Sequence, residues 1–105
     1  MIIVSAFSFN MIDTFPVSVV AKEISVGEAR QLVQDEEFTS AVGHTDTAPV
    51  FSSVLGVHVP YNRATVQLTQ GATALLGQLR GPRLPAGATS LPEGATIQWL
   101  LLTIG

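Results

Sequence analysis

The stretch Thr96-Ile97-Gln98-Trp99-Leu100-Leu101-Leu102-Thr103-Ile104 decides how this chain folds. It has the composition of a β-strand, and it carries apolar residues on both of the faces that a strand presents alternately. A strand with one face in water changes regularly between apolar and polar residues, and this stretch does not. It therefore predicts a central strand, or an edge strand that a second subunit buries.

Other stretches supply the strands and helices around it. Ser25 and Glu28 form a capping box, which predicts a helix to about Gln34 with Val26, Ala29 and Val33 on one face. A second helix is predicted with Asp46 or Thr47 as its N-terminal cap, Pro49 among its first positions, and Gly56 closing it after Leu55. Thr65–Thr69 and Ala72–Leu79 are predicted to pair as a hairpin about Gln70-Gly71. The remaining strand candidates are Met1–Phe9, Val17–Ile24 and the short Phe38–Val42.

This order of elements predicts one α/β domain over residues 1–105, with a mixed β-sheet of about five strands flanked by helices. Before the last strand, Leu84-Pro85-Ala86-Gly87 is nearly repeated as Leu91-Pro92-Glu93-Gly94. In each copy, proline at the second position of the four and glycine at the fourth favour a type I turn. The simplest interpretation of the pair is a rigid connection between strands.

The composition and charge of the chain exclude several classes of function. The chain has 105 residues, 47% of them hydrophobic, with a net charge of −3 and no cysteine. Disulfides, thiolate chemistry and cysteine zinc sites are thereby excluded, and binding to duplex DNA through phosphate attraction is disfavoured. No apolar run is long enough to span a bilayer, so we expect a cytoplasmic protein that binds no membrane. With only 12% charged residues, an apolar patch for self-association is expected, which favours a homo-oligomer.

His44 is the strongest candidate for chemistry, because it lies just before the predicted start of the second helix. Unpaired amides and partial positive charge at a helix start attract phosphate, so a histidine there could give a proton to an anionic substrate. The alternative is a capping or packing histidine. His58 lies between two valines and has no H-x-x-x-H partner, so no metal site is expected. Arg63, Arg80 and Arg83 could converge on one anion.

Four motifs in order resemble the small viral ring nucleases that act as anti-CRISPR proteins against type III immunity, with related proteins of archaeal viruses, phages and integrative elements. The motifs are Ala6-Phe7-Ser8-Phe9-Asn10-Met11, Val42-Gly43-His44 with Thr47, Asn62-Arg63, and Arg83-Leu84-Pro85 with Gly87. The resemblance covers most of the chain. It implies a homodimer that binds cyclic tetra-adenylate across its two-fold interface and cleaves it with neither metal nor cofactor.

The resemblance also implies roles for individual residues. By similarity His44 would be the general acid, and Arg63 and Arg83 would hold phosphate charge. Ser8 and Asn10 would bond ribose or phosphate, and Ser5 stands where relatives often have asparagine.

One departure from the family pattern leaves alternatives open. Relatives commonly have a glutamate implicated in catalysis where this chain has Ala86. Its absence motivates a second hypothesis, a non-catalytic sponge that only sequesters a cyclic nucleotide. Glu93 could replace it if the second turn folds toward the pocket. A third hypothesis, a DNA-binding viral protein, is disfavoured by the few basic residues.

Overall fold

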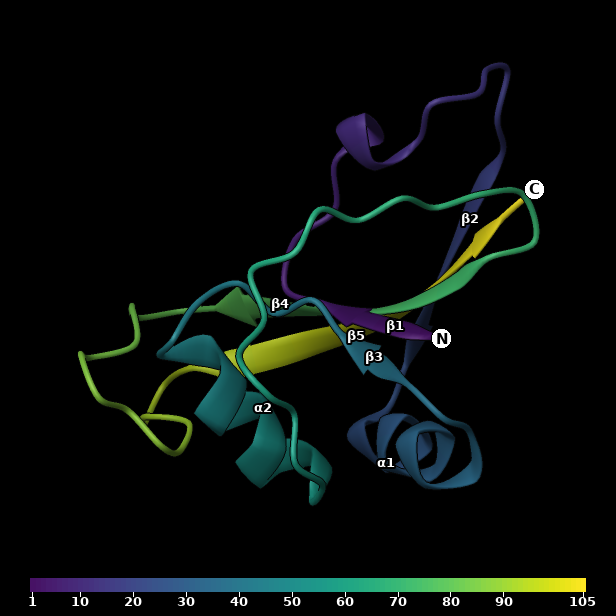
Figure 1. Cartoon of the computed structure of the whole chain (residues 1–105). Coiled ribbons are helices and arrows are strands. Elements are labelled where there is room, and N and C mark those ends of the chain that lie inside the picture. The colour runs from purple at the N-terminus through teal and green to yellow at the C-terminus, as the bar shows by residue number, and fades with distance from the viewer.

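β5 (Thr96–Ile104) runs through the sheet as an inner strand, as the sequence predicted. The computed structural model describes residues 1–105, and the strands lie in the order β2-β5-β4-β1-β3 (Figure 1). β5 pairs antiparallel with β2 and β4, whereas β1 pairs parallel with β3 and β4. This is the mixed five-stranded sheet that was expected. The other elements are β1 (Ile2–Val4), the 3-10 turn η1 (Phe9–Met11), β2 (Val19–Ile24), α1 (Val26–Asp35), β3 (Thr39–Ser40), α2 (Thr47–Leu55) and β4 (Thr73–Arg80).

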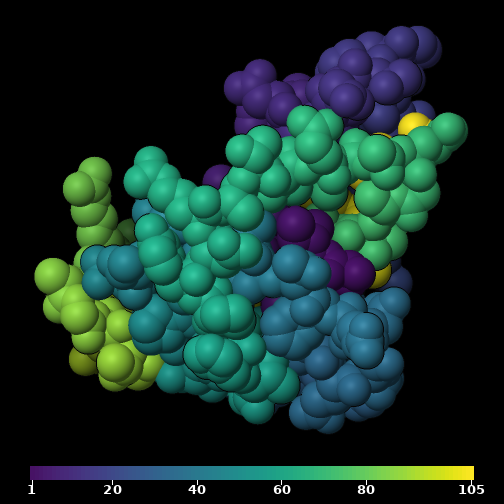
Figure 2. Space-filling view, viewed as in Figure 1, coloured from purple at the N-terminus to yellow at the C-terminus, as the bar shows by residue number.

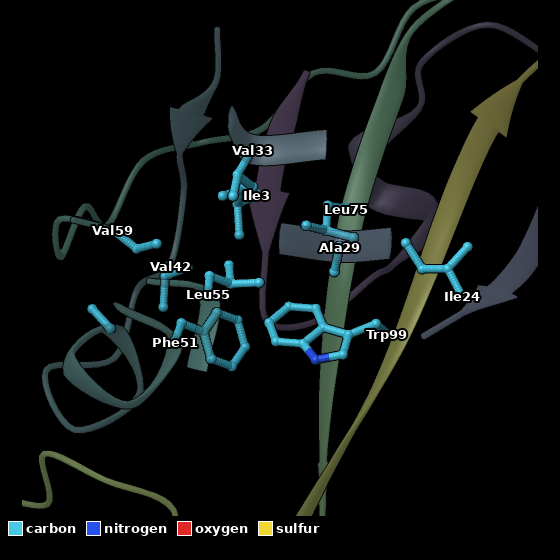
Figure 3. Packing of buried hydrophobic residues seen from close by; sticks show 11 residues of the cluster. Ile3, Ile24, Ala29, Val33, Val42, Phe51, Leu55, Val59, Leu75 and Trp99 are labelled. Carbon is cyan, nitrogen blue, oxygen red and sulfur yellow. The ribbon is translucent and has the colours of Figure 1, made fainter. Parts of the chain in front are cut away.

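Both helices cover one face of the sheet (Figure 1). The core on this side joins α1 and α2 to the central strands, and the rings of Phe51 and Trp99 meet in it (Figure 3). The capping box of α1 is present: Ser25 Oγ accepts the Glu28 N–H at 3.1 Å, and the Ser25 N–H donates to the Glu28 carboxylate at 3.2 Å. Ala29 and Val33 are buried as predicted, but Val26, at the first helical position, is 39% exposed.

The opposite face of the sheet is covered by chain that forms no strand. Residues 65–69 were expected to form a hairpin with the next strand, and this prediction is wrong, because β4 pairs with β5 and β1. Val66 and Leu68 instead bury their side chains against the second core cluster, and the Leu68 N–H donates to the Met11 carbonyl at 2.7 Å. Alternating side chains can thus mark a segment that lies across a sheet as well as one paired within it.

β1 is shorter than the sequence suggested. The predicted strand reached Phe9, but pairing ends at Val4. Its neighbour β3 is itself only Thr39–Ser40, so no partner continues on that side. The chain then leaves the sheet, and Ser8 caps η1 by accepting the Asn10 N–H at 3.2 Å. Because β1, β3 and β4 are parallel, their carboxyl ends open on the same edge of the sheet.

Candidate functional site

Two adjoining hollows lie at the edge where β1, β3 and β4 end, which is where open α/β sheets commonly bind ligands. Their volumes are about 380 Å³ and 350 Å³, and they share His44, Thr47 and Leu79. The first is also lined by Ser5, Ala6, Phe7, Gly77 and Gln78, and the second by Asp46, Arg83 and Leu84. Three predicted site residues, Ser5, His44 and Arg83, are thereby brought to one place.

His44 is held by the start of α2 while its ring stays exposed. Its carbonyl accepts the N–H groups of Thr47 and Ala48, both at 3.2 Å. Pro49, the next residue, has no N–H. In the first turn of α2, where amides free to bind a phosphate were expected, two N–H groups are therefore already bonded and the third does not exist. The expectation of free amides within the first turn of α2 is therefore wrong. What remains for an anion is the partial positive charge of the helix and the side chains around it.

Of the two predicted cap candidates, Asp46 is the N-cap residue of α2, but its side chain makes no capping bond. Its carboxylate accepts the Gly87 N–H at 3.0 Å, which ties the loop between β4 and β5 to the helix start. Farther along α2, the Ser53 hydroxyl donates to the Thr89 carbonyl. In Figures 1 and 2 this yellow-green loop lies beside α2 at one end of the molecule.

The two turns of this loop differ from the type I prediction. Hydrogen bonds run from the Ala88 N–H to Pro85 and from the Ala95 N–H to Pro92, both at 3.1 Å. Proline therefore takes the first position of each turn, and glycine takes the third. Gly87 and Gly94 have φ of +76° and +81°, as the third residue of a type II turn requires. Glu93 is exposed and lines neither hollow, so it does not take the place of a carboxylate at Ala86.

Arg63 lies beside the histidine segment without lining the hollows. The chain before it runs parallel to the extension of β3, with a bridge between Val42 and Tyr61. The Asn62 N–H donates to the Val42 carbonyl at 2.9 Å, and the Asn62 side chain donates to the Ser40 carbonyl at 2.8 Å. The Arg63 stem thus packs over Gly43, where an added Cβ would meet its Cγ at 3.5 Å.

Ser8 and Asn10 are exposed on η1 and also line neither hollow. Arg80 does not join the other arginines, because its guanidinium donates twice to the Gln98 side-chain oxygen, at 2.7 and 3.2 Å. The expected convergence of three arginines is therefore wrong within one chain. His58 lies in a separate groove of about 510 Å³, beside the outer side of α2.

Sequence reasoning missed Gln78, which lines the first hollow and donates to Gln98 at 3.0 Å. The two glutamines are directly opposite in the β4–β5 ladder. The sequence could have indicated them, because each is the only amide side chain in a mostly apolar strand. The chain has no group of three or more His, Asp or Glu side chains placed to hold a metal ion, and none of its helices has the length and apolar character needed to cross a bilayer.

Comparison with known proteins shows that this chain is similar to proteins of archaeal viruses. It is 39% identical over 67 residues to uncharacterized protein 26 of Sulfolobus islandicus filamentous virus (isolate Iceland/Hveragerdi), which covers 64% of this chain and 56% of that protein. It is 36% identical over 61 residues to uncharacterized protein ORF117 of Acidianus two-tailed virus, covering 56% and 52%. The matches thus span about half the length of these relatives.

Among solved structures, B116 of Sulfolobus turreted icosahedral virus (STIV) has the same fold. The TM-score is 0.81 with 97% of each chain covered, at 21% sequence identity. The STIV B116-like family matches residues 1–98, nearly the whole sequence. This chain therefore belongs to the STIV B116-like family of archaeal virus proteins.

Proposed function

We propose that this protein is a ring nuclease that binds cyclic tetra-adenylate and cleaves it without a metal, opposing type III CRISPR immunity. The observation that carries the proposal is the gathering of Ser5, His44 and Arg83 around adjoining hollows at one sheet edge. The choice of cyclic tetra-adenylate as the substrate rests on the resemblance of the sequence motifs to viral ring nucleases. In cleavage of an RNA phosphodiester, an imidazole can protonate the leaving oxygen, a guanidinium can stabilise phosphoryl charge, and a hydroxyl can bond the ribose or phosphate.

The proposed reaction is an in-line transfer within the RNA ring. A ribose 2′-oxygen forms a bond to the adjacent phosphorus as the bond from phosphorus to the 5′-oxygen breaks. The 2′-hydroxyl proton leaves to water, and His44 gives a proton to the departing 5′-oxygen. The products are a 2′,3′-cyclic phosphate and a 5′-hydroxyl. Arg83 stabilises negative charge on the phosphoryl oxygens, and Ser5 bonds the ribose or phosphate.

The ring also requires a second copy of the chain. Hollows of about 380 and 350 Å³ are the size of a pocket for one small ligand, and a ring of four nucleotides is larger. A two-fold dimer with two sets of these residues matches a ligand that has two-fold symmetry of its own. In such a dimer Arg63, Ser8 and Asn10, which lie outside the hollows, would contact the part of the ring that one protomer leaves uncovered. Exposed Phe9 and Phe15 supply apolar surface for association.

A cyclic-nucleotide sponge is the second candidate, and Ala86 favours it. Ala86 is exposed beside Gly87 and offers no carboxylate, and Glu93 does not approach the hollows. Binding through the arginines would survive the loss of such a group. If this loss has removed catalysis, Ala86→Glu should create ring cleavage in a protein that already binds the ring.

A single-turnover assay separates these functions. Excess protein is mixed with labelled cyclic tetra-adenylate in chelator, and intact ring is resolved from linear product while binding is followed in parallel. Product ending in 2′,3′-cyclic phosphate supports the nuclease, and tight binding with an intact ring supports the sponge. A protein that neither binds nor cleaves the ring would refute both.

A further inference from the structure

Asp46 is the one acidic residue that lines either hollow around His44. An aspartate at an N-cap ordinarily has extended backbone angles and accepts an N–H from the first turn of its helix. Asp46 has helical angles instead, with φ −89° and ψ −21°, and it makes no such bond. The His44 carbonyl takes the first amides of α2 in its place. The carboxylate is therefore free to bond elsewhere.

The bond that Asp46 makes joins two parts of the site. Its carboxylate accepts the Gly87 N–H at 3.0 Å, while Gly87 occupies the left-handed corner of the turn that Pro85 opens. Arg83 precedes this turn and lines the same hollow as Asp46. None of the residues between Gly81 and Ala95 pairs in the sheet. The Asp46 bond thus links the histidine side of the hollow to the arginine side.

A carboxylate is an unexpected residue beside a site for an anion, because it repels phosphate. If the side chain only had to line the hollow, a neutral residue would suit the ligand better. A charged acceptor does, however, hold a backbone N–H more strongly than a neutral one. The position of Asp46 is best explained by the loop that it holds.

We propose that Asp46 is a positioning residue: by anchoring the Gly87 amide, it holds the backbone that carries Arg83 at the hollow that His44 also lines, before the ligand arrives. The inference rests on the proposed function for the identity of the ligand. Preorganised groups bind and stabilise charge better than mobile ones, because their ordering is complete before binding. Without the bond, the turn would move, and the backbone that carries Arg83 would occupy a range of positions.

Three variants test this role. Asp46→Ala removes the acceptor of the Gly87 N–H, and Asp46→Asn keeps an oxygen that can accept it. Ser53→Ala removes only the other hydrogen bond between α2 and this loop, which the Ser53 hydroxyl donates to the Thr89 carbonyl. Amide exchange at Gly87 is measured by NMR without ligand, and affinity for cyclic tetra-adenylate is measured at one salt concentration. Thermal unfolding checks that each variant is folded.

We expect Asp46→Ala to speed Gly87 exchange and to weaken ring binding about tenfold, because the ligand must then order a loop that the charge-assisted hydrogen bond holds in the wild type. Asp46→Asn should restore affinity to within about threefold of wild type, and Ser53→Ala should leave Gly87 exchange unchanged. Unchanged exchange or unchanged affinity in folded Asp46→Ala would overturn the proposal, as would a failure of Asp46→Asn to rescue it. If the wild type binds no cyclic tetra-adenylate, the proposed function fails, and so does the role of Asp46 in binding that ligand. Amide exchange at Gly87 would still show whether the Asp46–Gly87 hydrogen bond holds the loop.

Discussion

The rings of Phe51 and Trp99 meet over Gly77, with their centroids 5.0 Å apart and their planes inclined by 60°. Phe51 comes from α2, and Trp99 lies directly opposite Gly77 in the β4–β5 ladder. A Cβ at Gly77 would lie 2.6 Å from Phe51 Cζ and 2.7 Å from Trp99 Cζ3, closer than real atoms approach. The missing side chain at Gly77 is therefore what lets α2, and with it the His44 turn, pack down on the sheet.

Gly77→Ala should lower the free energy of unfolding by about 2 kcal/mol, because the two rings must shift to admit one methyl group. Chemical denaturation followed by Trp99 fluorescence measures the change. Gly27→Ala is the matched control: its new Cβ would meet only the Ser25 Oγ, at 3.8 Å, and alanine favours the helix. Equal stability of Gly77→Ala and wild type would contradict this account of the packing.

Ser25→Ala should cost about 1 kcal/mol, since it removes the acceptor of the Glu28 N–H at the start of α1. Glu28→Gln keeps a side-chain oxygen that can accept the Ser25 N–H and should cost less. The two substitutions, made singly and together, form a double-mutant cycle in urea unfolding. Strictly additive effects would show that the two halves of the capping box do not depend on each other.

Local signals in the sequence predicted the elements that the structure confirms. β5 has the bounds that were predicted from its apolar faces, and the caps at Ser25 and Gly56 mark the helix ends as expected. Each of these signals depends on groups a few residues apart or on the burial of one strand. Such information is contained in a short window of sequence.

The wrong predictions concern partners that are distant in the sequence. Val66 and Leu68 alternate like a strand, but only the position of Met11 decides that they lie across the sheet. The amides at the start of α2 looked free until the His44 carbonyl was placed against them. Asp46 is at the predicted N-cap position, but its side chain bonds Gly87, 41 residues away, and not an amide of the helix. No local pattern encodes such contacts.

His44→Ala should lower single-turnover cleavage of cyclic tetra-adenylate at least about a hundredfold, the usual contribution of a general acid. Ring binding should fall little, because the charge that holds phosphate comes mainly from arginine. His58→Ala is the matched control, since His58 lies in a separate groove. Full cleavage by His44→Ala would remove the histidine from the mechanism, and equal loss in both variants would indicate a general effect on folding.

Arg83 and Arg80 are a matched pair for testing the anion site. Both lie near the C-terminal end of β4, but their side chains have different contacts. Arg83 lines the hollow, and no protein acceptor holds its guanidinium, whereas Arg80 donates twice to Gln98 on the sheet. Arg83→Ala should weaken binding of cyclic tetra-adenylate by about tenfold or more and reduce its salt dependence, because a phosphate contact is lost. Arg80→Ala should leave affinity and salt dependence near wild type. Titration of each variant at several salt concentrations measures both, and an equal loss of affinity would mean that the net charge of the chain, and not the placement of Arg83, controls binding.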